Sequence, residues 1–207
     1  MAASKLSIFN GALTKWLGER KLASLSEARE SRRILDDIWD DDFIASCLEA
    51  GEWNFAARSA ALDYSTTTEP PFGYIRAFEK PEDWKRSITV AEDPYFRWPS
   101  RKYSDEAGFW FADVDILYVK YVSDDAAYGS DFSLWPASFT HWVEVHLAFL
   151  ACERLTQSES KKLMLEKKDS RLFNKAISID AMNDPVPSPP NGTWVNARLR
   201  GTVNRER

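Results

Sequence analysis

The stretch LEAGEWNFAAR, residues 48–58, decides how the first part of this chain folds. Upstream of it, apolar residues recur at three- and four-residue steps, the period of a helix with one buried face. These residues are Ile34, Leu35, Ile38, Trp39, Phe43, Ile44, Cys47 and Leu48. The spacing predicts one long acidic helix from about Ser26 to Ala50, with Gly51 as its stop because glycine accepts the backbone conformation that ends helices. Trp53 and Phe55 then enter the core in an extended segment.

The same period predicts three more helices. The first runs from about Ser4 to Leu17, the third begins at Pro136, and the fourth runs from about Ser158 to Met182. The expected buried stripe of the third helix is Phe139, Val143, Leu147, Leu150 and Leu155. That of the fourth is Leu165, Leu172 and Ile179. On the solvent side of the fourth helix, Lys162 is expected to pair with Glu166.

Between the helix pairs, residues 72–122 are rich in aromatic and β-branched side chains, a composition typical of short antiparallel strands. The clearest part is a meander in which Phe109–Phe111 turns around Asp113 into the strand Ile116–Val122. The predicted fold class is therefore α+β, a bundle of about four helices with a central antiparallel β-sheet region and an extended C-terminal arm. The predicted division is a helical bundle of residues 1–64 and 136–184, an aromatic-rich β region of residues 65–135, and a proline linker with a basic arm, residues 185–207.

Charge is distributed unevenly along the chain. The net charge is −5, yet the residues from Trp194 onward hold four arginines against Glu206, a net +3 that leaves −8 for the rest. This asymmetry predicts a basic tail that docks on an acidic surface. The prolines between Pro185 and Pro190 make a stiff connection, and a tryptophan near arginines is typical of an interface anchor. The arm candidates are Trp194, Val195, Arg198 and Arg200. The alternative is a disordered terminus with no docking role.

The segment between Ile34 and Ala57 has no basic residue and seven acidic ones. Asp36 with Asp40, and Asp37 with Asp41, stand four apart, which costs a helix roughly 0.2–0.5 kcal/mol per pair. Arg32 and Arg33, one turn earlier, offset part of this cost. A metal site is disfavoured because consecutive aspartates on a helix point in different directions and the EF-hand spacing is missing.

The cysteines and histidines of the sequence do not predict an enzymatic site. Cys47 and Cys152 lie on apolar helical faces and are expected to be buried, reduced thiols in a soluble protein made in a reducing cytoplasm. His141 and His146 are five apart, about 140° around a helix, so they cannot share zinc as residues four apart do. Phosphate-binding and hydrolase motifs are not found in the sequence, and no apolar run approaches membrane-spanning length. No enzymatic activity, cofactor or metal is predicted.

Eighteen of the 28 aromatic residues lie between Phe72 and Trp142. Aromatic residues on an open sheet can stack on sugars or bases, and the first candidates are Trp98, Trp110, Tyr118 and Tyr121. Core and subunit-interface roles are the favoured interpretation, since tyrosine and tryptophan are enriched at protein contacts. A carbohydrate-binding or hydrolytic protein is the alternative function, with paired carboxylates among Asp124, Asp125 and Asp131.

Several strings together resemble the head-to-tail adaptors of short-tailed bacteriophages, the tail tubular protein A family. They are LGER with Leu22 at residues 17–22, RRILDDIWD at 32–40, CLEAGEWNFA at 47–56, YVSDDAAYGSDFSLWPASF at 121–139 and PPNGTWVNAR at 189–198. They cover nearly the whole chain in order, and none of them encodes chemistry. A helical scaffold without a phage role would require these matches to be accidental.

The resemblance implies a structural virion protein without enzymatic activity. It implies a ring of twelve copies that joins the portal to the tail nozzle, with tail fibres as further partners and no membrane partner. Viral DNA would pass through the ring without sequence-specific contacts. The protein would be made in the host cytoplasm and reside at the head-to-tail interface. In such a ring, Asp36, Asp37, Asp40 and Asp41 are candidates for a negative channel wall, and a solvated face or a contact with a basic neighbour are the alternatives.

Overall fold

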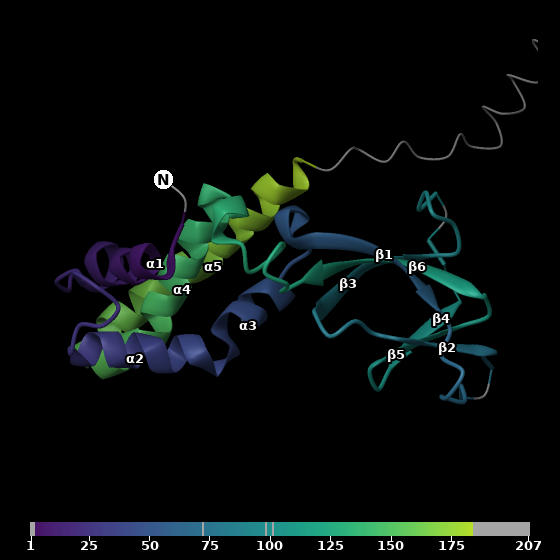
Figure 1. Ribbon diagram of the computed structural model, residues 1–207. Coiled ribbons are helices and arrows are strands. Elements are labelled where there is room, and N and C mark those ends of the chain that lie inside the picture. Colours follow the sequence, from purple (N-terminus) through teal and green to yellow (C-terminus); the bar gives the residue numbers. More distant parts are fainter. Residues whose placement is uncertain (1–2, 72, 98, 101, 184–207) are drawn as a thin grey trace, which may run out of the picture.

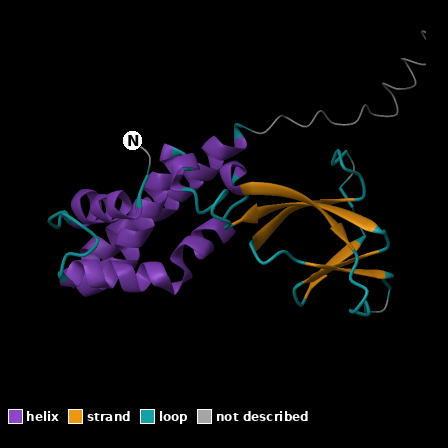
Figure 2. Cartoon of the chain, viewed as in Figure 1, coloured by secondary structure: helices purple, strands orange, loops and turns teal. Residues whose placement is uncertain are grey.

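The computed structural model describes residues 3–71, 73–97, 99–100 and 102–183, and it has the predicted mixed α+β architecture. A helical unit and a β unit lie end to end (Figures 1 and 2). The α-helices are α1 (Lys5–Gly11), α2 (Glu30–Ile38), α3 (Ile44–Glu49), α4 (Ala137–Thr156) and α5 (Glu159–Ala181). Two π-helical segments, Ala12–Leu17 and Trp39–Phe43, follow α1 and α2, and Asn54–Ala56 and Phe132–Leu134 are short 3-10 helices. The strands are β1 (Ala57–Asp63), β2 (Arg76–Glu79), β3 (Trp84–Ala91), β4 (Tyr103–Glu106), β5 (Phe109–Ala112) and β6 (Ile116–Ser123).

Three helices begin where local sequence signals predict. Ser4 caps α1, because its hydroxyl accepts from the Ser7 amide at 3.2 Å while the Ser7 hydroxyl accepts from the Ser4 amide at 2.8 Å. Pro136 precedes α4, and the Ser158 hydroxyl accepts from the Lys161 amide at the start of α5. These boundaries are local, so the sequence could predict them.

The prediction of one long acidic helix is wrong, because the segment forms two helices, α2 and α3, with a kink between them. The chain leaves helical geometry at Asp41 (φ −89°, ψ 56°) and at Asp42, whose φ of +51° is left-handed. Aspartate is a poor helix former that tolerates this conformation, and three consecutive aspartates place the break here. The expected start is also wrong, because α2 begins at Glu30. Gly51 does not end the helix by its conformation; a Cβ there would lie 2.8 Å from the Trp53 ring, so close packing requires the glycine.

The β unit consists of two three-stranded antiparallel sheets, with strand orders β1-β6-β3 and β2-β5-β4. Both strands of the predicted meander are present, as β5 and β6, but their predicted pairing is wrong because they belong to different sheets. β5 pairs instead with β4 through a turn in which Ala107 (φ 48°) and Gly108 (φ 83°) are both left-handed. The helical boundary at residue 64 is also too late, because residues 57–63 form β1.

Each unit has its own hydrophobic core. In the helical unit, Trp53 packs against Phe139 and Trp142, with ring centroids 4.7 and 5.6 Å apart. In the β unit, the two sheets enclose Phe78, Val90, Trp110, Leu117, Val119 and Tyr121. The single buried stripe predicted for α4 is wrong in part, because Leu150 is 43% exposed while Val145, Ala148 and Ala151 on other faces are buried.

Candidate functional site

The acidic segment of α2 is largely neutralised by the chain itself. Asp36 accepts a hydrogen bond from Arg32 and lies 3.0 Å from the Lys5 ammonium, which is also 3.5 Å from Asp40. Asp37 pairs at 3.5 Å with Arg154 of α4, not with Arg33.

The acidic residues at the kink differ from those on α2. Asp41 and Asp42 are exposed, and no cationic group among the described residues lies within 4 Å of either. The kink removes Asp41 from the helical stripe of Asp37. The free negative charge of this surface is therefore concentrated at the kink.

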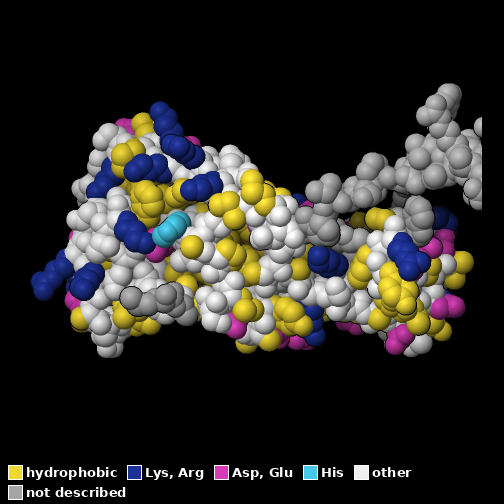
Figure 3. Space-filling model, turned by 90° about the horizontal axis from the view of Figure 1, so that it is seen from above, with side chains coloured by type: hydrophobic (Ala, Val, Ile, Leu, Met, Phe, Trp, Pro, Cys, Tyr) yellow, Lys and Arg dark blue, Asp and Glu magenta, His cyan; other side chains and the backbone are white. Residues whose placement is uncertain are grey.

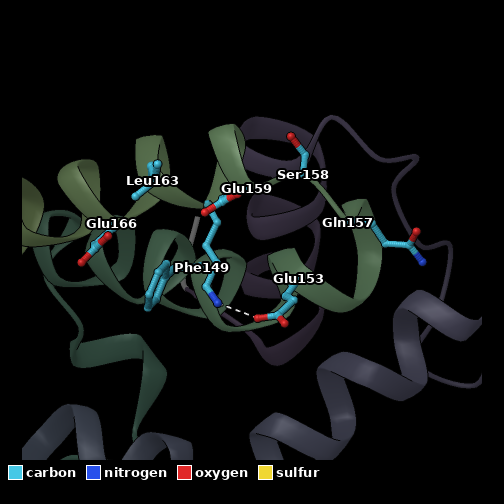
Figure 4. A pocket seen from close by; sticks show the side chains of 8 residues that line it. Phe149, Glu153, Gln157, Ser158, Glu159, Leu163 and Glu166 are labelled. Atoms are coloured by element: carbon cyan, nitrogen blue, oxygen red, sulfur yellow. Dashed lines mark hydrogen bonds and ion pairs between the residues drawn. The ribbon is translucent and has the colours of Figure 1, made fainter.

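A hollow of about 680 Å³ lies between the end of α4 and the start of α5, and we call it the α4–α5 hollow (Figure 4). Its lining is Phe149, Glu153, Gln157, Ser158, Glu159, Lys162, Leu163 and Glu166. Gln157, with φ of +51°, ends α4 and turns the chain into α5, so the two helices form an antiparallel hairpin. The hollow therefore brings together side chains from the two arms of this hairpin.

The lining of the α4–α5 hollow combines two apolar side chains, Phe149 and Leu163, with three glutamates, which we call its rim. The Phe149 ring lies between the Glu153 and Glu166 side chains (Figure 4), and Leu163 is 52% exposed. Lys162 was predicted to pair with Glu166. It pairs instead with Glu153, at 2.5 Å. This contact lowers the pKa of Glu153 and raises the pKa of Lys162. Three glutamates against one lysine leave the rim negative.

Apolar side chains are exposed along the same helices. Met182, just beyond α5, is 80% exposed, and Ile179, predicted to be in a buried stripe, is also exposed. The other exposed apolar residues of α4 and α5 are Leu150, Leu163, Met164 and Ile177. Figure 3 shows Lys and Arg side chains among exposed hydrophobic side chains on the helical unit. Such a surface is typical of protein contacts.

The cysteines and histidines are structural. Both cysteines are buried and free, as predicted. Burial, assisted by the Asp169 carboxylate, raises the pKa of the Cys47 thiol, which keeps it unreactive. His146 stacks on Phe43 and lies 3.0 Å from Asp169, while His141 lies 3.4 Å from Glu144. In the described part of the chain, His, Cys, Asp and Glu side chains form no group of three that could hold a metal ion.

The aromatic candidates for ligand stacking belong mainly to the core. Trp110 and Tyr121 are buried, and Tyr118 is half-buried, whereas Trp98 lies outside the described residues. The Trp110 indole donates to Asp105 at 3.1 Å and to Ser87 at 3.2 Å. The interpretation of Trp110 and Tyr121 as stacking residues is therefore wrong, because neither ring is accessible to a ligand.

The acidic loop carboxylates stabilise local structure. Asp124 pairs with Lys85 at 2.7 Å, and Asp125 accepts from the Ala127 amide at 2.8 Å. Asp131 accepts from the hydroxyl and the amide of Ser133 at 2.6 and 2.9 Å, and these bonds lower its pKa. A lowered pKa disfavours the general-acid role that a glycosidase needs.

Some sequence predictions concern residues that are not described. Trp194, Val195, Arg198 and Arg200 lie outside the described residues, as does the linker from Pro185 to Pro190. Among the described helices, none has the length and apolar character needed to cross a membrane.

Sequence reasoning missed the α4–α5 hollow. Its residues are ordinary helix formers, and only the hairpin brings Phe149 and Glu153 beside Leu163 and Glu166. The short connection of Gln157 and Ser158 could have predicted that the two helices pack side by side, because short connections join antiparallel neighbours.

Comparison with known proteins adds no assignment: no protein-family model matches this chain, and no curated protein matches it.

Proposed function

We propose that this chain is a non-enzymatic structural subunit, the adaptor that forms a ring, of twelve copies, between the portal and the tail nozzle of a short-tailed bacteriophage. The ring forms part of the channel for viral DNA, and its partners are further copies of the chain, the portal, the nozzle and tail fibres. Its place is the head-to-tail interface of the virion, after synthesis in the host cytoplasm. The resemblance of the ordered sequence strings supports this proposal.

The observation that carries the proposal is the exposed apolar surface of α4 and α5. Leu163, Met164 and Met182 leave apolar area in water, and a contact with another protein would bury it. The mixture of apolar and cationic side chains fits an interface that also selects its partner by charge.

The kink contributes the negative channel wall in this proposal. Asp41 and Asp42 are exposed and have no cationic partner among the described residues, while Asp36 has two and Asp37 and Asp40 have one each. A negative wall repels phosphates at short range, so DNA slides without binding. The arm residues Trp194, Val195, Arg198 and Arg200 are proposed to act in assembly.

The test is to mix the purified chain with a purified portal ring and to measure mass by native mass spectrometry and symmetry by electron microscopy. We expect a ring of twelve copies stacked on the portal, whether or not the chain alone is monomeric. A chain that stays unbound beside an intact portal at micromolar concentrations would contradict the proposal.

A further inference from the structure

We propose that the α4–α5 hollow is the docking site for the basic C-terminal segment, residues 184–207, of a neighbouring copy of this chain. The inference rests on the proposed ring and names one of the contacts that close it. Its basis is the chemistry of the hollow, the composition of the segment and the position of each on the chain.

The hollow and the segment have complementary chemistry. The segment contains Trp194 and four arginines against two acids, Asp184 and Glu206, a net charge of +2. Phe149 and Leu163 offer an apolar surface for the indole, and the glutamates of the rim accept hydrogen bonds from guanidinium groups. A volume of about 680 Å³ is in the usual range of pockets that enclose a ligand.

Two carboxylates of the rim are available to a partner. Lys162 pairs with Glu153, whereas neither Glu159 nor Glu166 has an ion-pair partner within 4 Å among the described residues. Arginines from another chain would gain two charge-assisted contacts there without breaking a pair within the fold.

The positions favour a neighbour over the same chain. The hollow lies at the start of α5, and the chain leaves the helix at its other end, after 23 residues or about 34 Å. Trp194 is 11 residues beyond Asn183, which spans about 34 Å in an extended proline-rich form. To reach its own hollow, the segment would have to reverse at once and run fully stretched beside α5.

A site and its ligand at opposite ends of one helix make a head-to-tail contact. Repeated around an axis, such contacts generate a closed ring when the rotation between subunits closes, whereas a two-fold dimer would exchange two segments reciprocally. The arrangement is therefore compatible with the proposed ring.

The first test uses a fluorescein-labelled peptide of residues 184–207 and the full-length chain, with binding followed by fluorescence anisotropy. We expect saturable, salt-sensitive binding that weakens at least tenfold in the Glu159→Lys, Glu166→Lys chain. The matched control is Asp63→Lys, Glu69→Lys, which makes the same charge change at exposed positions of the β unit and should leave binding unchanged. Equal binding by the hollow variant and the wild type, or no binding by the wild type, would overturn the inference.

A peptide series keeps the test independent of protein folding. The Trp194→Ala peptide and the Arg198→Glu, Arg200→Glu peptide should each bind the wild-type chain at least tenfold more weakly. The Arg198→Glu, Arg200→Glu peptide should in turn bind the Glu159→Lys, Glu166→Lys chain better than the wild type. If the two peptide variants bind as the unmodified peptide does, the segment is not recognised by its tryptophan and arginines.

Charge exchange between chains separates a neighbour from the same chain. Mixing the Glu159→Lys, Glu166→Lys chain with the Arg198→Glu, Arg200→Glu chain should restore chemical cross-links between copies that neither forms alone. If the wild-type chain forms cross-links between copies and the mixture does not, a neighbouring copy is not the partner of the segment. Ring formation on the portal without peptide binding would refute this inference alone, whereas peptide binding without ring formation would refute the proposed function.

Discussion

Asp83, which directly precedes β3, is bonded to the neighbouring strands β1 and β6 through its single carboxylate. It accepts hydrogen bonds from Arg58 of β1 at 2.8 Å, from the Tyr121 hydroxyl of β6 at 3.1 Å, and from Ser123. Burial raises the pKa of Asp83, but the bonds from Ser123, Arg58 and Tyr121 outweigh it and leave the pKa below its usual value. Burial, with the nearby Asp83 charge, raises the pKa of Tyr121 to about 12. The charged form of Asp83 is thus the one that the fold holds.

Replacing Asp83 with Asn should lower the free energy of unfolding at pH 7 by about 1.5–3 kcal/mol, the usual worth of hydrogen bonds to a charged group. Urea denaturation measures this change. The matched control is Asp115→Asn, which removes a carboxylate that is 79% exposed and pairs with Arg76 at 3.1 Å. The Asp115→Asn control should lose about 0–1 kcal/mol of unfolding free energy. Equal losses in the two variants would show that Asp83 is no more than a surface ion pair.

The same carboxylate should make the fold sensitive to acid. Because the folded pKa of Asp83 is below the ordinary value of 3.8, its contribution is fully present above that value and is lost as the pH falls through the lower folded pKa. Urea denaturation between pH 7 and pH 2.5 should therefore show a smaller loss of stability for Asp83→Asn than for the wild type. Parallel pH profiles of the two proteins would contradict this assignment.

At the scale of elements, the kink between α2 and α3 sets the direction of the acidic surface. Trp39 and Phe43 flank it, with ring centroids 5.8 Å apart, and Phe43 stacks on His146 of α4. The aromatic packing holds the two helices in register across a break that a continuous helix would not have.

Glycine substitution should distinguish a kink from a helix. Asp42→Gly should leave stability unchanged or raise it by up to about 1 kcal/mol, because glycine accepts φ of +51° without steric cost. Asp37→Gly, inside α2, should lower stability by about 0.3–1 kcal/mol, because glycine is a poorer helix former than aspartate and the exposed ion pair with Arg154 is lost. Thermal unfolding of the two variants checks the opposite signs. A similar loss at both positions would indicate that the helix is continuous.

The proposed assembly concerns the whole molecule, and the exposed apolar side chains of α5 make it testable. Met164→Asp should abolish ring formation on the portal. It should change the free energy of unfolding by less than about 0.5 kcal/mol, since the Met164 side chain is already exposed. Ile75→Asp is the control, because Ile75 is 65% exposed and directly precedes β2, a strand that lies away from α5 (Figure 1). Native mass spectrometry of each variant mixed with the portal measures ring formation. If Met164→Asp assembles as the wild type does, α5 is not part of the interface.

In the proposed ring, passage of DNA should depend on the charge at the kink. Asp41→Asn with Asp42→Asn should leave ring assembly intact but slow DNA ejection, because the repulsion of phosphates within about 8 Å is lost. Ejection from virions that carry the variant can be timed by release of dye-stained DNA. Unchanged ejection would leave these carboxylates as a solvated surface, and loss of the ring would show that they pair with a neighbouring subunit.

The sequence by itself determined the features that depend on near neighbours. The cap at Ser4, the start of α4 after Pro136 and the cap at Ser158 each involve residues within one turn of a helix. The mixed α+β class and the two buried thiols also followed from local composition and periodicity. These signals are readable because a helix is built from contacts three and four residues apart.

Only the tertiary structure decided the pairings between distant segments. Whether β5 pairs with β6 or with β4, and whether Lys162 meets Glu166 or Glu153, depends on which partner the fold brings close. The same holds for Trp110 and Tyr121, whose sequence is compatible with either an exposed face or a core, and which the second sheet buries. The α4–α5 hollow exists because two helices fold against each other, so no periodicity within either helix could reveal it. Contacts between residues far apart in sequence are set by the free energy of the whole packed chain, which no short window contains.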